Sequence, residues 1–367
     1  MFQSTFKDKI FYETFAKFAS VIHGRICDMN KVRFGVIGTN NITDWVIAGG
    51  RQDSRFELTA VCSRTQERAE EFASKHGIPY TFTSLEEMAG SDVVDAVYIA
   101  TPNCFHAPQA ILCMDHGKHV LCEKPFASNA AEVKAMIEAA KRNSVTLMEA
   151  MISTLNPNFR IIRDRLSELG KIRRYFASYC QYSSRYDKFK EGIVLNAFKP
   201  ELSNGAVMDI GIYTIYPMIA LFGKPDSIDA KGIVLSSGAD GQGAINFSYD
   251  GMNATVLYSK IANSFLPSEI EGEAGNLIID QIHIPRNVDF VPRIPTGQGK
   301  SQKAVREPVG TTLDFSEYYY EIKEFIDLVL EGKKESSVNT LDNSLATIEV
   351  IDEIRRQLGV IYPADKK

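Results

Sequence analysis

The sequence lacks the features that mark membrane, secreted and metal-binding proteins. No stretch of its 367 residues approaches the roughly 20 consecutive apolar residues of a membrane-spanning helix. Its six cysteines form no C-x-x-C pair, and its six histidines show no metal-ligand spacing. A net charge of −5 gives no basic excess for nucleic acid or an anionic membrane. These absences predict a soluble cytoplasmic protein with free thiols, no metal, and neither nucleic acid nor membrane as a partner.

Residues 1–30 precede the first regular pattern and need a separate interpretation. Apolar side chains recur there at helical spacing from Phe2 to Ile22, while charged residues between them exclude the apolar core of a signal peptide. An organelle-targeting peptide fits less well, because such peptides avoid acidic residues. We interpret this segment as an N-terminal extension, either a peripheral helix or a translation artefact ahead of a natural start at Met29.

Residues 31–150 alternate short apolar runs with helical segments. The runs Val32–Ile37, Leu58–Cys62, Val93–Ala100 and His119–Cys122 are typical of strands, and their near-continuous apolar character indicates burial on both faces. Repeated β-α-β units of this length predict a doubly wound parallel sheet of the Rossmann type. Because the whole chain exceeds the size of a single core, a second domain is expected.

The pattern changes over residues 151–367. A predicted helix at Ser203–Leu221 is followed, between residues 227 and 279, by long strands without intervening helices. This order predicts an α+β domain with a large, mainly antiparallel sheet whose open face suits a partner. The last segments are predicted to be a loop and two amphipathic helices, namely Arg286–Thr311, Phe315–Leu330 and Leu341–Leu358.

A glycine turn after the first predicted strand indicates dinucleotide binding. The turn keeps Gly38, the first glycine of the G-x-G-x-x-G pattern, but has Asn40 at the second glycine position. Asparagine is the next best residue at positive φ, so the turn can still form. A strand-glycine turn alone is weak evidence, but its place at the start of a βαβ series favours a cofactor site formed by Gly38, Thr39, Asn40, Asn41 and Ile42.

The end of the second predicted strand bears on the choice of nicotinamide cofactor. An NAD site usually has an acidic residue there for the ribose 2′-hydroxyl. Here the strand is followed by Ser63 and Arg64. A hydroxyl and a guanidinium suit a 2′-phosphate, because arginine binds phosphate through bidentate charged hydrogen bonds. These residues predict NADP in preference to NAD, although a surface arginine at a helix start would look the same.

Two more strand ends lie at the carboxyl edge of the predicted sheet, where doubly wound folds bind ligands. One strand runs through Ala100 into Thr101-Pro102-Asn103, and the next ends at Glu123-Lys124-Pro125. Pro125 disfavours a helical conformation at Lys124, so an extended turn should project into the cleft.

Three motifs in this order resemble the Gfo/Idh/MocA family of oxidoreductases. They are A-T-P-N-x-x-H at residues 100–106, G-K-H-V-L-C-E-K-P at 117–125 and G-A-V-M-D-I-G-I-Y at 205–213. The resemblance covers nearly everything from residue 31 onward. It implies hydride transfer between NAD(P) and a CH–OH group of a sugar, polyol or trans-dihydrodiol, and a homodimer or homotetramer joined through the C-terminal sheet. It also implies that Lys124 is catalytic and that a set of residues lies beside the nicotinamide, namely Ala100, Thr101, Pro102, Asn103, His106 and Glu123.

Hydride transfer from a carbinol carbon requires a partner for the hydroxyl proton. Asp209 and Tyr213 stand four residues apart on the predicted helix, so they share a face. We expect Tyr213 to bind the substrate oxygen, with Lys124 nearby and Asp209 orienting Lys124 or a substrate hydroxyl. Beside a cationic nicotinamide the pKa values of Tyr213 and Lys124 should fall, and the two should titrate as a coupled pair. Without the three motifs, Tyr213 would be interpreted as a packing residue.

The sequence predicts the type of reaction more precisely than the substrate. Tyr182 and Arg185, in a predicted loop after a strand, suit either a sugar or a hydrophobic diol. Tyr213 resembles the dihydrodiol dehydrogenase and glucose–fructose oxidoreductase branches, whereas inositol-dehydrogenase-like members have histidine, which argues against inositol. Two alternatives stay open: a non-catalytic NAD(P)-binding sensor on the same fold and, less favoured, a redox-assisted glycosidase.

Overall fold

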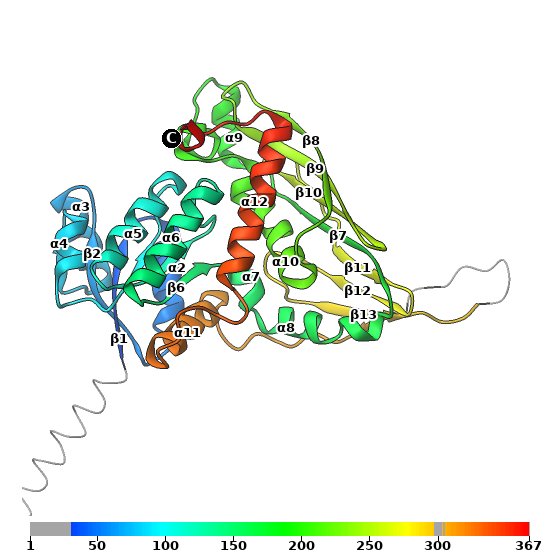
Figure 1. Ribbon diagram of the computed structural model, residues 1–367, viewed down its shortest axis with the longest axis horizontal. Helices are drawn as coiled ribbons and strands as arrows, with labels where there is room; N and C mark the ends of the chain where they lie inside the picture. Colours follow the sequence, from blue (N-terminus) through cyan, green and yellow to red (C-terminus); the bar gives the residue numbers. More distant parts are fainter. Residues whose placement is uncertain (1–30, 297–302, 304, 367) are drawn as a thin grey trace, which may run out of the picture.

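Two β-sheets, with helices between them, form the protein in the computed structural model (Figure 1). The structure describes residues 31–296, 303 and 305–366. The predicted N-terminal extension and Cys27 therefore lie outside the described residues. None of the helices in the described part of the chain is long and apolar enough to cross a membrane.

The first sheet has six parallel strands in the order β3-β2-β1-β4-β5-β6. Its central strands are buried along almost their whole length, which explains their continuous apolar sequence. The predicted doubly wound parallel sheet is confirmed. Its elements are β1 (Val32–Ile37), α2 (Asn41–Gly50), β2 (Phe56–Cys62), α3 (Gln66–His76), β3 (Tyr80–Phe82), α4 (Leu85–Gly90), β4 (Ala96–Ile99), η1 (Asn103–Phe105), α5 (His106–Asp115), β5 (His119–Glu123), α6 (Ala130–Asn143) and β6 (Leu147–Ala150).

The strand order of this sheet reverses at β1, which has β2 on one side and β4 on the other. The connection after β1 runs toward β2, and the connection after β4 runs toward β5, in the opposite direction. Doubly wound sheets bind ligands in the crevice outside the carboxyl ends of the strands at such a point. The turn that contains Gly38 and the segments that contain Thr101 and Lys124 all follow strands at this edge. The fold thus gathers the predicted cofactor residues on one side of the sheet.

The second sheet has eight strands in the order β14-β13-β12-β11-β7-β10-β9-β8. Only the pair β7–β10 is parallel, so the prediction of a mainly antiparallel sheet is confirmed. The bounds are β7 (Ile172–Cys180), β8 (Ser227–Val234), β9 (Asp240–Tyr249), β10 (Met252–Ser259), β11 (Ser268–Gly272), β12 (Gly275–Ile279), β13 (Val288–Pro292) and β14 (Glu307–Pro308).

The rest of the second part of the chain forms helices and short turns, namely α7 (Ile152–Leu155), α8 (Pro157–Asp164), η2 (Leu166–Leu169), α9 (Ser184–Lys190), η3 (Asn196–Phe198), η4 (Pro200–Leu202), η5 (Val207–Gly211), α10 (Ile212–Phe222), α11 (Glu317–Leu330), α12 (Leu341–Leu358) and η6 (Pro363–Lys366). The helices α10 and α12 cover one face of the sheet (Figure 1). The other face, the open face, presents the exposed side chains of Ile233, Ala244 and Asn246.

Two predictions for this part of the chain were wrong. The segment predicted as the loop Arg286–Thr311 contains β13 and β14, because β13 pairs with β12 and carries Pro292 at its end, where no ladder hydrogen bond is lost. The predicted helix Ser203–Leu221 is interrupted. It starts with η5, a π-helical turn, and continues as α10 only from Ile212.

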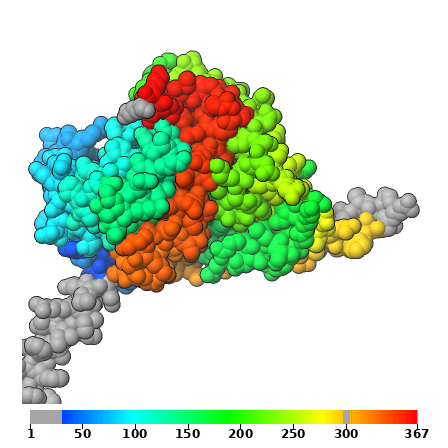
Figure 2. All heavy atoms as spheres, in the orientation of Figure 1, coloured from blue at the N-terminus to red at the C-terminus, as the bar shows by residue number. Residues whose placement is uncertain are grey.

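The helix α11 packs back against the first sheet, although it follows the whole second sheet in sequence. It lies on α2, where Gly49 allows the approach. A side chain at residue 49 would place its Cβ 2.6 Å from the Cβ of Tyr318. Phe325 is fully buried in the same core as Phe34 of β1, with ring centroids 5.8 Å apart. In Figure 2 the orange surface of this segment lies against the blue and cyan surface of the first half.

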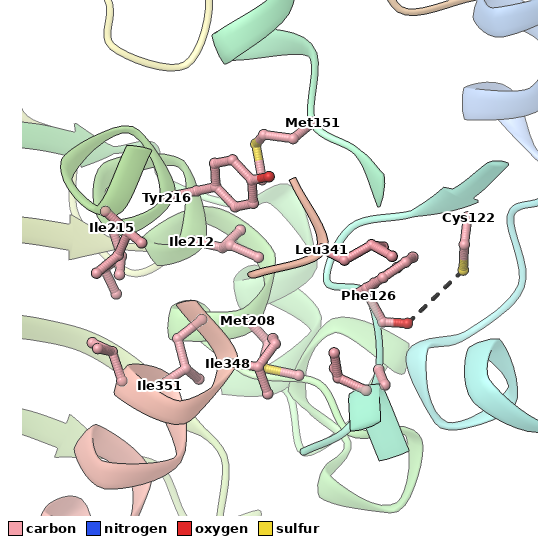
Figure 3. Close-up of a cluster of buried hydrophobic side chains, with 14 of the residues drawn as sticks. Cys122, Phe126, Met151, Met208, Ile212, Ile215, Tyr216, Leu341, Ile348 and Ile351 are labelled. Atoms are coloured by element: carbon pink, nitrogen blue, oxygen red, sulfur yellow. Dashed lines mark hydrogen bonds between the residues drawn. The ribbon is translucent and has the colours of Figure 1, made fainter. Parts of the chain in front are cut away.

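A continuous apolar core joins the two sheets behind the predicted site. Phe126, which follows Lys124-Pro125, is fully buried, and Figure 3 shows it next to Leu341 of α12. Tyr216 of α10 points toward Met151 in the same view. Burial of large side chains on both sides fixes the segment after β5 relative to α10. The relative positions of Lys124 and the residues of η5 and α10 therefore depend on this core.

Candidate active site

The turn after β1 is shaped by Gly38 and fastened by Asn40. Gly38 has φ +100°, and a Cβ there would lie 2.4 Å from the carbonyl oxygen of Ala100. Only glycine fits such a close approach at positive φ. Asn40 has φ −108°, so the expectation of positive φ at this residue was wrong. It caps α2 instead: its Oδ1 accepts from the backbone N–H groups of Ile42 and Thr43, and its Nδ2 donates to Ala100.

The capped turn leaves the start of α2, with Asn41 and Ile42, at the crevice. Helix N-termini bind phosphate because their first N–H groups are free and the helix dipole favours a negative charge. Asn40 occupies the N–H groups of Ile42 and Thr43, and Gly38 lets the turn pass close to the Ala100 backbone at the end of β4. The turn therefore fits a pyrophosphate.

The end of β2 presents two arginines. Ser63 and Arg64 follow the strand, and the Arg64 side chain is exposed. Arg68, one turn into α3, donates from Nε to the Thr39 hydroxyl at 3.0 Å and from its terminal nitrogen to the Thr39 carbonyl at 2.7 Å. Arg68 was not predicted as a cofactor residue from the sequence. Its position in the first turn of the helix that follows Arg64 is the signal that could have indicated this role. Arg68 also pairs with Glu71 of α3, but no acidic residue stands at Cys62-Ser63-Arg64-Thr65. Two guanidinium groups and a hydroxyl at the strand end are a donor set that suits a 2′-phosphate.

The loops after β4 and β5 are tied together by His106. Its fully buried ring lies 2.8 Å from the carbonyl oxygens of both Thr101 and Pro125. Burial outweighs the two carbonyl contacts and lowers the pKa of His106, so the ring is neutral and donates to one of the two oxygens at a time. Pro102 precedes the short turn η1 between these contacts. His106 thus connects the two cofactor-edge loops, and the bond between Lys124 and Pro125 is cis.

Two further residues of these loops make buried polar contacts. Asn103 donates to the Ser203 carbonyl and to the Asn204 side chain, both at 2.8 Å, which joins the first half of the chain to the segment before η5. Glu123 accepts a 2.5 Å hydrogen bond from the Tyr98 hydroxyl. Burial raises the pKa of Glu123, and the Tyr98 bond only partly offsets the rise.

Lys124 lies between the two halves of the protein, with 12% of its side chain exposed. Its Nζ donates to the carbonyl oxygen of Asp209 at 2.8 Å and lies 3.4 Å from Asp209 Oδ1. The same nitrogen is 4.7 Å from the centre of the Tyr213 ring. The structure therefore brings together the three residues that the sequence assigned to catalysis, and the π turn of η5 directs both the carbonyl and the carboxylate of Asp209 toward Lys124.

Lys260, which the sequence analysis missed, completes the charge balance. It follows β10, is buried, and forms an ion pair with the second carboxylate oxygen of Asp209. Burial alone would raise the pKa of Asp209, but the ammonium groups of Lys124 and Lys260 outweigh it and hold that pKa well below its usual range. Asp209 is therefore ionised, and it fixes two cations in one site. No sequence motif surrounds Lys260, so only the register of β10 reveals it.

The pKa of Tyr213 is raised well above its ordinary value, first by burial and then by the nearby carboxylate of Glu123. A lowered pKa was expected for Tyr213 from the positive charges of Lys124 and an oxidised nicotinamide alone, and this expectation was wrong. The desolvation of the ring and the negative groups of the protein act in the opposite direction. Tyr213 is a protonated phenol at neutral pH, and it can donate a hydrogen bond to a substrate oxygen.

The predicted substrate residues lie in a separate aromatic cluster. The hydroxyl of Tyr182 donates to Asp187, and its ring packs edge-on against Tyr186. Arg185 is exposed on α9. Two residues absent from the predictions, Tyr179 and His283, stand closer to the chemistry, because both rings pack against Tyr213.

Comparison with known proteins identifies the family. The model for the GFO_IDH_MocA oxidoreductase family, described as an NAD-binding Rossmann fold, matches residues 32–151, and the model for the GFO/IDH/MocA C-terminal domain matches residues 160–278. The scyllo-inositol 2-dehydrogenase (NADP(+)) IolU of Bacillus subtilis is 51% identical over 91% of this chain and 99% of its own length. This chain belongs to the Gfo/Idh/MocA family. The predicted family, fold and oxidoreductase class are thereby confirmed.

A further relative and two solved structures show how widely the fold is used. The trans-1,2-dihydrobenzene-1,2-diol dehydrogenase of Xenopus tropicalis is 32% identical over 84% of this chain and 91% of its own length. Among solved structures, KijD10, a 3-ketoreductase from Actinomadura kijaniata in complex with NADP and TDP-benzene, has a TM-score of 0.75 at 23% identity, covering 89% of this chain and 98% of its own. A levoglucosan dehydrogenase has a TM-score of 0.75 at 19% identity, covering 90% and 97%. The two structures share the fold with this chain.

Proposed function

We propose that this protein is an NADP-dependent dehydrogenase that oxidises a ring hydroxyl of an inositol or a related polyol to a ketone. The observation that carries the proposal is the convergence of Lys124, Asp209 and Tyr213 beside the carboxyl edge of the Rossmann sheet. The relative named for scyllo-inositol, at 51% identity, supports the substrate class. It outweighs the argument against inositol that the sequence analysis drew from Tyr213.

A nicotinamide dinucleotide bound at the carboxyl edge of the first sheet would supply the hydride acceptor for the carbinol carbon. Tyr213 donates a hydrogen bond to the substrate oxygen. The Nζ atom of Lys124 lies 4.7 Å from the centre of the Tyr213 ring, so both residues can take part in transferring the hydroxyl proton. Asp209 orients Lys124 and, with Lys260, sets the charge around it. In its neutral amine form Lys124 accepts the hydroxyl proton, directly or through the Tyr213 hydroxyl, and then releases that proton to water, so the substrate loses one hydride and one proton. His106 and Asn103 act as positioning residues, because their hydrogen bonds hold the loops and not a ligand.

The proposed cofactor site uses the turn Gly38–Ile42 for the pyrophosphate and Ser63, Arg64 and Arg68 for the 2′-phosphate. Ala100, Thr101 and Pro102 would line the nicotinamide end. The half-buried Ser63 hydroxyl, the exposed Arg64 guanidinium and the absence of an acidic residue at Cys62-Ser63-Arg64-Thr65 support NADP over NAD.

Steady-state assays with scyllo-inositol and with both cofactors test the proposal. We expect turnover with NADP⁺ and a much lower kcat/KM with NAD⁺, measured by the absorbance of the reduced cofactor. Arg64→Ala should lower kcat/KM for NADP⁺ by roughly 10- to 150-fold, because a charged hydrogen bond contributes about 1.5–3 kcal/mol. The value for NAD⁺ should change little, because that cofactor has no phosphate at this position.

Two controls accompany this assay. Arg68→Ala should act in the same direction as Arg64→Ala, whereas Arg142→Ala should leave both cofactor constants unchanged. Arg142 is also exposed but pairs with Asp115, away from the crevice. Preference of the parent protein for NAD⁺ would contradict the cofactor proposal, and a lack of turnover with every polyol and dihydrodiol would contradict the function.

We also propose that two or more copies assemble through the open face of the second sheet. Ile233 is 48% exposed there and pairs with Gln242 of β9, while Ala244 of β9 pairs with Leu257 of β10 on the same face. Light scattering after size exclusion should give the mass of a dimer or a tetramer, and Ile233→Asp should shift it to that of a monomer. Tyr80→Asp, at the far edge of the first sheet, is the matched control that should not change the mass. A monomeric parent protein would refute the assembly.

A further inference from the structure

Three aromatic side chains form a wall beside Lys124, which we call the aromatic wall: Tyr179, Tyr213 and His283. The rings of Tyr179 and His283 are stacked, with centroids 3.9 Å apart and an interplanar angle of 2°. Tyr213 meets both edge-on, at 5.8 Å from Tyr179 and 6.2 Å from His283. All three side chains are partly exposed, so the wall faces a space that solvent reaches.

The loop between β12 and β13 holds His283 in place. The carboxylate of Asp280 accepts hydrogen bonds from the backbone of Arg286 and the side chain of Asn287. Asn158, fully buried on α8, donates to the carbonyl oxygens of Pro285 and Arg286. These bonds close the loop on itself and fasten it to the protein, so the imidazole is preorganised before any ligand arrives.

The chemistry of His283 is that of a neutral imidazole. Burial, with a smaller contribution from Arg286, lowers its pKa to about 4, so the ring carries no charge at neutral pH. A neutral imidazole has one N–H donor and one acceptor nitrogen, and both lie in the plane of the ring. Stacking on Tyr179 uses the face of the ring and leaves these two in-plane positions for a hydroxyl group.

We propose that His283 is a substrate-binding residue that hydrogen-bonds a ring hydroxyl and so selects polyols over trans-dihydrodiols. The inference rests on the proposed function. An inositol carries a hydroxyl on every ring carbon, whereas a trans-dihydrodiol has hydroxyls on two adjacent carbons and is apolar elsewhere. If a dihydrodiol binds Tyr213 and Lys124 through its two hydroxyls, the imidazole of His283 faces only C–H groups of the ring. The imidazole then has no hydrogen-bond partner, which is unfavourable in a half-buried site.

The test compares two substrates in His283 variants. His283→Phe keeps a flat ring on Tyr179 but removes both nitrogens. We expect kcat/KM for scyllo-inositol to fall by about tenfold, the size of one neutral hydrogen bond, while the value for trans-dihydrobenzenediol stays the same or rises. His283→Gln, which keeps a donor and an acceptor, should recover part of the inositol activity. Equal changes for the two substrates, or none for either, would overturn the inference.

An analogue without the remote hydroxyls provides the second readout. The six hydroxyls of scyllo-inositol are equivalent, so the analogue has to lack all those beyond the reacting pair, as trans-cyclohexane-1,2-diol does. If His283 contacts a remote hydroxyl, kcat/KM for this diol should show no loss in the His283→Phe variant, while scyllo-inositol shows the full loss. If the variant has the same effect on both substrates, His283 binds no remote hydroxyl and the inference fails.

Direct binding separates the failure of this inference from failure of the proposed function. If the parent protein oxidises neither substrate, the proposed dehydrogenase function fails. The role of His283 can still be tested in that case, by calorimetric titration of the protein–NADP⁺ complex with scyllo-inositol. Weaker binding to His283→Phe by about tenfold supports the inference. Equal binding to both proteins, or binding to neither, refutes it. NADP⁺ affinity and the thermal unfolding midpoint should be the same in both proteins, because His283 lies apart from the cofactor turn.

Discussion

Lys124→Ala should abolish polyol oxidation while the protein still binds NADP⁺. We expect kcat to fall by at least about 10³-fold, because this variant removes the cation that lies against Tyr213 and anchors on the Asp209 carbonyl. The fold should survive, since Lys260 still neutralises the Asp209 carboxylate. Turnover assays with saturating NADP⁺, together with fluorescence titration of the cofactor, separate loss of chemistry from loss of binding.

Lys118, at the other end of β5, provides the control for this variant. Lys118 stands just before β5 and donates to the carbonyl oxygens of Ser91 and Val94, at the opposite edge of the sheet from Lys124. Lys118→Ala should therefore affect thermal stability and leave kcat close to that of the parent. Lys124→Met, which keeps the length of the side chain, should be as inactive as Lys124→Ala. Activity near the parent value in either Lys124 variant would refute the proposed mechanism.

Tyr213→Phe should reduce kcat by about 10²–10⁴-fold, the usual contribution of a group that handles a proton. The ring would stay packed against Tyr179 and His283, so only the hydroxyl is removed. The pKa of Tyr213 is raised, so the phenol stays protonated through the neutral range. The loss should therefore be the same at every pH from roughly 6 to 9. Pre-steady-state measurement of cofactor reduction in both proteins gives this loss directly.

Tyr216→Phe is the matched control, three residues later on the same helix. Its ring is fully buried in the core between the two sheets and points toward Met151 (Figure 3). We expect kcat to stay at the parent value, with at most a small change in stability. A Tyr213→Phe variant that retained more than about a tenth of the parent kcat would show that the proton leaves by another route.

The residues at the carboxyl edge of the first sheet could be predicted because parallel strands end at one edge. Gly38, Arg64, Thr101 and Lys124 each follow a strand, so the strand pattern alone assigns them to one crevice. The role of Asn40 could not be read in this way. Asparagine both tolerates positive φ and caps helices, and only the backbone decides between the two. In the structure it caps α2.

The residues contributed by the second sheet were harder to predict. Lys260 and His283 follow strands whose neighbours are set by long-range pairing, and the parallel pairing of β7 with β10 places Lys260 near the end of β7. No local pattern encodes that register. The expected i,i+4 relation of Asp209 and Tyr213 put both residues in the right place. It did not anticipate the π turn, which brings the Asp209 carbonyl as well as its carboxylate to Lys124.

The return of α11 to the first sheet has a consequence for how the protein is made. The apolar surface of α2 and β1, including Val46, Ile47 and Phe34, is covered by Ile322, Phe325 and Ile326. A ribosome that has released the chain only as far as residue 300 leaves this surface bare, although every strand of the first sheet has already emerged. The cofactor-binding half therefore reaches its full stability only after nearly the whole chain has been synthesised.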